Sequence, residues 1–386
     1  MPIKSLAYNL LPQGFTFLIY VFLLPFITVN LDESSAIQFA LIVTAISFLN
    51  NGTFGGNQYL IFHTSRGELS SRKLLLPIAI GITTAVIILS LLLGEANDRT
   101  KGIFSLVCIL IPFSNIARAI FEGQQRFFLS LSTKLIFNGL LISAISAILF
   151  FEIADSIFVC SYLVASIVII IILWQFREND RNTVSKAELG NKNKYPMFLM
   201  SFVLLISFLY LDRITVFFMD KEQFAYDAIL FEQLIKLSLP LNLLVMYVFP
   251  KVSAGERFKQ IFYQLWFKWL LVVLASYLIF SPLLLWISHS ITGFGYGRSH
   301  TSYFNSIGLV LFISVTMVAV QLSPLIVASS KKYFLKMFFP YVVIILLSTY
   351  FVESLMFRLL LQCFFCLCLL LNAYNGRLTG PNASSV

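Results

Sequence analysis

Long apolar segments are the feature that most limits how this chain can fold. A helix needs roughly 17–25 apolar residues to cross about 30 Å of hydrocarbon. About twelve such runs occur, at approximately 11–29, 36–62, 74–94, 103–121, 135–151, 157–176, 197–217, 226–249, 266–287, 304–327, 337–352 and 355–372. Only helices or closed barrels satisfy the backbone in lipid, and these runs lack the alternation of barrel strands. The sequence therefore predicts an all-α polytopic membrane protein with about 12 transmembrane helices.

Composition agrees with this class. Of the 386 residues, 59% are hydrophobic and only 12% are charged, whereas soluble domains have nearer a quarter charged residues. The net charge of +9 raises the question of nucleic acid, which requires a basic face on a folded domain. Here the basic residues lie in short loops between apolar runs, as membrane topology produces. We therefore expect a lipid bilayer and no nucleic acid as partner.

The distribution of basic residues predicts the orientation. If the N-terminus is cytoplasmic, most of the 27 Lys and Arg residues fall in loops on the cytoplasmic side, as the positive-inside rule requires. The longest of these loops is polar and lies at the middle of the chain, at 175–195. We expect both termini to be cytoplasmic.

The polar middle loop predicts two halves. We expect an N-terminal six-helix lobe at 1–176, a cytoplasmic linker at 177–195 and a C-terminal six-helix lobe at 196–386. With an offset of 188 residues, Asp32 aligns with Asp220, and the Ala-Leu-Ile that begins at 40 aligns with the Ala-Ile-Leu that begins at 228. Parallel repeats of this kind place a binding site at their interface.

Charged residues interrupt the apolar pattern between 208 and 240. Asp212 and Arg213 lie late in one predicted span, and Glu232 and Lys236 lie inside the next. Lys236 is roughly ten residues into its span, so about 15 Å deep at the helical rise. Charges at membrane depth are costly and usually mark an ion or substrate path. This hairpin is our first functional-site hypothesis.

A structural interpretation of the same charges stays open. Glu232 and Lys236 are four residues apart and can neutralise each other on one helix face, while Asp212 and Arg213 can pair across to the following span. Arg118 repeats the i,i+4 spacing with the glutamate at 122, at the cytoplasmic end of its span, where an arginine reaches the interface. There we favour a structural role, with substrate contact as the alternative.

Neither a metal nor a cofactor is predicted. The Cys-x-x-Cys-x-Cys run at 363–368 lies in an apolar segment without histidine or carboxylate partners, so we interpret the cysteines as small buried hydrophobes. The histidines at 63, 289 and 300 are far apart in sequence. No Walker-type phosphate loop is present. We expect a protein that is not an enzyme.

Several short motifs, in order along the chain, resemble those of one family. They are Pro25-Phe26-Ile27-Thr28, Asn51-Gly52-Thr53-Phe54-Gly55-Gly56, Phe121-Glu122-Gly123-Gln124-Gln125-Arg126-Phe127, Asp212-Arg213-Ile214 followed by Phe224-Ala225-Tyr226, and Phe249-Pro250-Lys251. Together they resemble the Wzx-type O-antigen and polysaccharide flippases of the multidrug/oligosaccharidyl-lipid/polysaccharide exporter superfamily. One departure is Ser34-Ser35-Ala36, where the family often has a glycine.

The resemblance implies a two-lobed carrier in the bacterial inner membrane. Its central cavity, lined by basic and aromatic groups, would move undecaprenyl-diphosphate-linked oligosaccharide by alternating access, with a polysaccharide polymerase and a chain-length regulator as possible partners. A diphosphate is attracted to cationic groups in a low-dielectric cavity, which makes Lys236, Arg213 and Arg118 candidates. For the sugars we expect hydrogen bonds from amides such as Asn138 and Asn242.

Energy coupling and function class remain open at this point. A buried carboxylate with a raised pKa can exchange a proton for substrate, and Asp212 and Glu232 are the candidates. The alternatives are a multidrug or cation antiporter of the same superfamily, a polysaccharide polymerase, and a non-transporting scaffold. A cationic cavity disfavours the first. The absence of a large predicted exterior loop disfavours the second, and the intramembrane charges disfavour the third.

Overall fold

The computed structural model shows an all-helical protein in the part of the chain that it describes. Described are residues 14, 16–51, 56–65, 67, 79, 83, 111, 114–133, 216–218, 220–237, 268–294, 307–316, 336, 339–340, 343–344, 346–347 and 355–378. Every regular element in these ranges is a helix, which confirms the all-α prediction for them. Judged by length together with apolarity, no helix of the described ranges meets the requirement for crossing a bilayer.

The chain divides into two compact units. Unit 1 consists of Met1–Ile27 and Leu41–Tyr195, and unit 2 consists of Thr28–Ala40 and Pro196–Val386. The helix count of each lobe and the total of twelve spans stay predictions.

The first predicted span contains two helical pieces. A π-helix, η1, covers Ile19–Leu23, and α2 follows over Leu24–Asn30. The wide turn occurs where Pro25 has no N–H to donate to the preceding turn, because a proline removes one backbone hydrogen bond. The N–H of Leu24 instead donates to the carbonyl of Ile19.

The turn between α2 and α3 is closed by a helix cap. α3 covers Glu33–Asn51, and Asp32 precedes it. The Asp32 carboxylate accepts hydrogen bonds from the Ser34 hydroxyl at 2.5 Å and the Ser35 N–H at 3.2 Å, which is the N-cap arrangement. These bonds, with the Ser34 hydroxyl as the largest cause, lower the pKa of Asp32 from 3.8 to about 2.

In unit 1, α4 packs against the helical residues 114–123. α4 covers Gly56–Ser65, and a Cβ atom added to Gly123 would lie 2.6 Å from the Cβ of Thr64. Only glycine allows so close an approach. A turn with Gln125 at φ 62° then leads into the helical residues 127–133. The motif at 121–127 is therefore a tight corner between helices.

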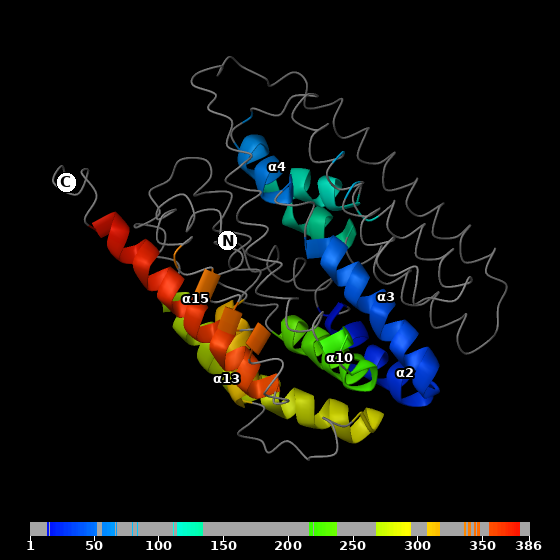
Figure 1. Ribbon diagram of the computed structural model, residues 1–386. Coiled ribbons are helices and arrows are strands. Elements are labelled where there is room, and N and C mark those ends of the chain that lie inside the picture. The colour runs from blue at the N-terminus through cyan, green and yellow to red at the C-terminus, as the bar shows by residue number, and fades with distance from the viewer. Residues whose placement is uncertain are drawn as a thin grey trace. The chain divides into compact units, whose positions relative to one another are not determined.

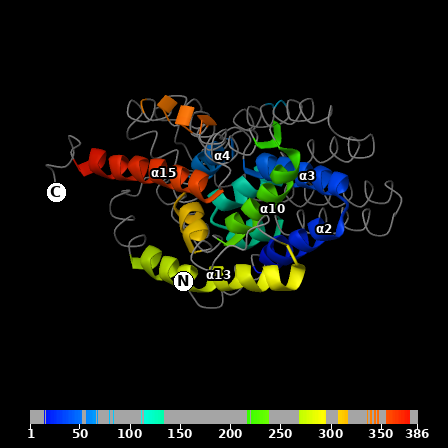
Figure 2. The ribbon, with the colours of Figure 1, turned by 60° about the horizontal axis from the view of Figure 1, so that its bottom comes forward.

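In unit 2, four helices make up most of the described residues (Figure 1). They are α10 over Lys221–Leu237, α13 over Lys268–Thr292, the residues 307–316, and α15 over Leu355–Leu378. Figure 2 shows residues 307–316 next to α15. α10 begins at Lys221, earlier than the expected residue 226, because its first turn is polar and an apolar window does not detect it.

Candidate functional site

The structure describes three of the seven predicted site residues. Asp212, Arg213, Asn138 and Asn242 lie outside the described residues, so the hypotheses about them stay predictions. Glu232 and Lys236 lie in α10 of unit 2, and Arg118 lies in residues 114–123 of unit 1.

Helix α10 of unit 2 is buried over most of its length. Every residue from 227 to 237 is buried, although this stretch includes three charged side chains. The exposed fraction is 0% for Glu232 and 7% for Lys236. Their spacing of four residues places them on the same helix face. Long charged residues are almost never fully buried unless they are paired. The role of Glu232 and Lys236 in a substrate or ion path stays a prediction.

A buried ion pair joins α10 to α15. Nη2 of Arg358 donates to Oδ2 of Asp227, and the Arg358 side chain is 1% exposed against 12% for Asp227. The two residues are 131 positions apart in the chain. A charge pair removed from water in this way holds two helices in register, since each charge alone in the interior would cost several kcal/mol.

A second polar contact joins α10 to α13. Nε2 of Gln233 donates to Oγ of Ser288 at 3.2 Å. At the end of α13, the ring of Phe294 lies against Tyr226 of α10 with centroids 5.7 Å apart. α10 is thus tied to α13 as well as to α15 by polar side chains.

The outer face of α15 is apolar, whereas its inner face combines polar side chains with the apolar Leu359 and Phe365. The exposed face presents large hydrophobic side chains at helical spacing, namely Phe357, Leu360, Phe364, Leu367 and Leu371. The buried face contains Arg358 and Gln362, followed by Cys366. A helix at a water-facing surface has the opposite arrangement.

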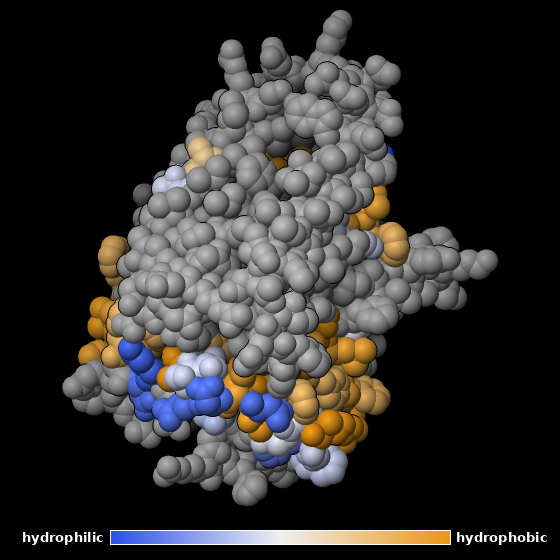
Figure 3. Space-filling model, turned by 90° about the vertical axis from the view of Figure 1, so that its right-hand side faces the viewer, coloured by the Kyte–Doolittle hydropathy of each residue, from blue (hydrophilic) through white to orange (hydrophobic). Residues whose placement is uncertain are grey.

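Helix α13 shows the same inversion. Ile279, Phe280, Leu283 and Trp286 are exposed. Ser281, Ser288 and Thr292 are buried. Figure 3 shows one face of the molecule on which hydrophobic residues border a compact hydrophilic area. Exposed charged residues occur at helix ends, such as Glu33 of α3 and Lys221 of α10.

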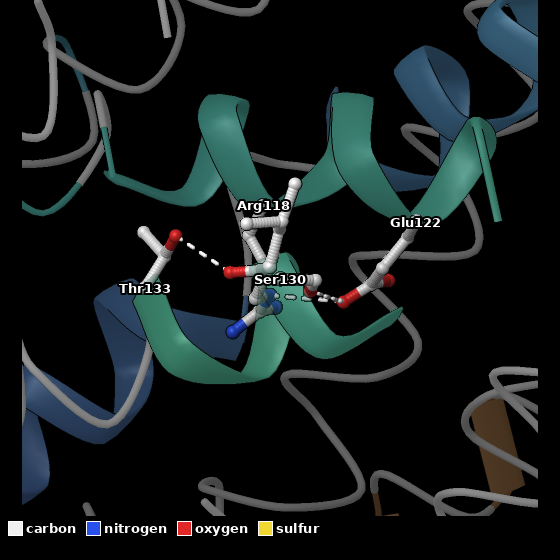
Figure 4. Close-up of polar contacts among 5 residues, drawn as sticks. Arg118, Glu122, Ser130 and Thr133 are labelled. Atoms are coloured by element: carbon white, nitrogen blue, oxygen red, sulfur yellow. Dashed lines mark hydrogen bonds and ion pairs between the residues drawn. The ribbon is translucent and has the colours of Figure 1, made fainter. Parts of the chain in front are cut away.

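Arg118 belongs to a polar network that braces the corner of unit 1. Nε of Arg118 lies 3.2 Å from Oε1 of Glu122, and the hydroxyl of Ser130 donates to the same oxygen at 2.9 Å. Figure 4 shows this carboxylate between the two helices on either side of the corner. Because Glu122 links both helices, the contacts favour the structural role for Arg118.

Sequence reasoning missed Asp227, Gln233, Arg358 and Gln362. Arg358 lies in the last apolar segment of the sequence, and the structure places it inside α15, where it is buried. The available signal was the presence of charged residues within two apolar runs, Asp227 in 226–249 and Arg358 in 355–372. This signal did not identify Asp227 and Arg358 as partners, because the two residues are far apart in sequence.

Within the described ranges, no group of His, Cys, Asp or Glu residues has an arrangement that would hold a metal ion. Cys363, Cys366 and Cys368 of α15 have free thiols. No protein-family model, curated protein or solved structure matches the chain.

Proposed function

We propose that the protein is a flippase of the bacterial inner membrane that moves undecaprenyl-diphosphate-linked oligosaccharide from the inner to the outer leaflet by alternating access. The observation that carries this proposal is the inverted polarity of unit 2. Its charged residues Asp227, Glu232, Lys236 and Arg358 are buried, and the outward faces of α13 and α15 consist largely of Phe, Leu, Ile and Trp.

Inverted polarity supports a lipid-embedded carrier for an energetic reason. Soluble monomers rarely expose apolar patches larger than a few hundred Å², whereas hydrocarbon is a good solvent for such side chains. In the same environment, ionisable residues face the interior, pair with one another and mark the path of an ion or substrate. The buried face of α10 fits such a path.

The proposed cargo carries negative charge on its diphosphate and hydrogen-bonding groups on its sugars. Lys236 supplies a compact ammonium group that binds phosphate as a point charge. Glu232, four residues earlier on the same face, is the candidate for proton exchange. Asp212 is a second candidate for proton exchange, and Arg213 is a further candidate for binding the diphosphate.

Replacing Lys236 tests the proposal. We expect Lys236→Ala to abolish surface polysaccharide while the protein still inserts, and Lys236→Arg to retain most of it because the charge is kept. Lys221→Ala is the matched control, since Lys221 begins the same helix but is exposed. The measurements are the amount of surface polysaccharide and the leaflet in which single lipid-linked units accumulate.

The leaflet in which the lipid-linked units accumulate distinguishes a flippase from a polymerase. Accumulation in the inner leaflet supports a flippase, whereas accumulation in the outer leaflet supports a polymerase. Normal transport by the Lys236→Ala variant would refute the role of this lysine in holding the diphosphate.

A further inference from the structure

Two residues on the inner face of α15 have polar atoms without a hydrogen-bond partner among the described residues. Arg358 is 1% exposed and Gln362 is 0% exposed. They are four residues apart, so their side chains lie one above the other on the same helix face. The two side chains therefore lie next to each other at one location inside unit 2.

The hydrogen-bonding capacity at this location is large. Arg358 uses Nη2 for Asp227, but Nε and Nη1 have no hydrogen-bond partner among the described residues. Neither Nε2 nor Oε1 of Gln362 has one there. Buried polar groups are normally satisfied by protein, water or ligand, and a carboxamide that serves only packing would be replaced at little cost by an apolar side chain.

The charge balance indicates what kind of ligand fits. The buried charged residues of unit 2 in the described ranges are Asp227, Glu232, Lys236 and Arg358, which is two of each sign. Arg358 already has Asp227 beside it, so the location offers hydrogen bonds without surplus positive charge. A neutral hydroxyl donates one hydrogen bond and accepts others, and it matches the donors of Arg358 and the donor and acceptor of Gln362.

We propose that Arg358 and Gln362 form a subsite that binds sugar hydroxyl groups of the translocated oligosaccharide. This inference depends on the proposed function and assigns the sugar moiety, rather than the diphosphate, to this part of α15. Because both side chains are buried in this structure, a sugar reaches them in the other conformation that alternating access requires.

The test uses the full-length purified protein in lipid nanodiscs and two probes. One probe is undecaprenyl diphosphate, and the other is the sugar-bearing lipid extracted from source cells that lack this gene. The variant is Gln362→Met, which keeps the side-chain length and removes the amide. Leu360→Met is the matched control, because it introduces the same residue on the exposed face of α15.

We expect the original protein to bind the sugar-bearing lipid more tightly than undecaprenyl diphosphate. Gln362→Met should weaken binding of the sugar-bearing lipid about tenfold and leave binding of undecaprenyl diphosphate unchanged. Its ligand-free melting temperature should stay the same or rise, since a buried unsatisfied amide is removed. Leu360→Met should change none of these quantities.

Other results overturn the inference in distinguishable ways. A lower ligand-free melting temperature with unchanged lipid affinities would show that the amide is structural. If Gln362→Met weakened the binding of both lipids equally, the subsite would not recognise the sugar. Equal affinities of the original protein for the two lipids would remove the subsite but leave the flippase proposal standing. If neither lipid bound, both proposals would fall together.

Discussion

The ion pair between Asp227 and Arg358 gives the sharpest prediction about stability. Asp227→Leu leaves the Arg358 guanidinium, which is 1% exposed, without its carboxylate in the interior of unit 2. Breaking a buried pair from one side typically costs about 3–5 kcal/mol. Because 12% of the Asp227 side chain is exposed, we expect the lower end, about 3 kcal/mol, which is roughly a hundredfold change in the unfolding equilibrium.

A double-mutant cycle separates the pair from the packing around it. Replacing both residues, as in Asp227→Leu with Arg358→Met, removes both charges together, so we expect the double variant to lose about 1 kcal/mol or less. The assay is denaturant unfolding of the purified protein in detergent, followed by tryptophan fluorescence.

A matched control comes from unit 1. In the Arg118–Glu122 pair the Arg118 side chain is 18% exposed, and Glu122 keeps its hydrogen bond from Ser130. Arg118→Met should therefore cost less than Asp227→Leu, because the buried Glu122 carboxylate keeps the hydrogen bond from Ser130. A loss below about 1 kcal/mol for Asp227→Leu, or a double variant as unstable as the sum of its single variants, would contradict a desolvated and coupled pair.

Two further predictions concern the helix cap and the exposed faces. The pKa of Asp32 is lowered to about 2 in the folded protein, so the stabilisation from its charge should be present above about pH 4 and disappear as the pH falls toward 2. A stability difference from Asp32→Asn that stayed constant over this range would contradict the capping role. Phe364→Lys places a charge on the exposed face of α15 and should oppose membrane insertion by about 2.5–3.5 kcal/mol, lowering the inserted fraction. Ser290→Lys, at the end of α13, should have no such effect, and normal insertion of Phe364→Lys would argue against lipid contact.

The helical fold of the described residues is the part that sequence reasoning predicted well. Long apolar runs indicate helices because no other open structure satisfies the backbone in lipid. A glutamate and a lysine inside such a run, like Glu232 and Lys236, stand out for the same reason, and the structure buries both. These predictions needed only the order of residues within one segment.

The partners of the buried charges were not predictable in the same way. Asp227 and Arg358 are 131 residues apart, and hydropathy gives the polarity of a position but not its neighbour in space. The start of α10 was missed for a related reason, because the polar turn after Lys221 is helical without being apolar. Contacts such as that of Gly123 with Thr64 depend on backbone distances, which composition does not encode.

The inverted polarity explains why the polar residues of unit 2 are the more informative ones. On α15, the side chains of Phe364 and Leu371 are largely exposed, so another apolar side chain of similar size would serve there equally well. Arg358 and Gln362 instead occupy the inner face, where each polar atom needs a partner of defined geometry. In a soluble domain a hydrophobic stripe defines how helices pack, and its polar face varies freely. Here the packing of α15 on α10 is specified by the Asp227–Arg358 pair, so a change of charge on the inner face should alter helix docking, whereas an apolar exchange on the outer face should not.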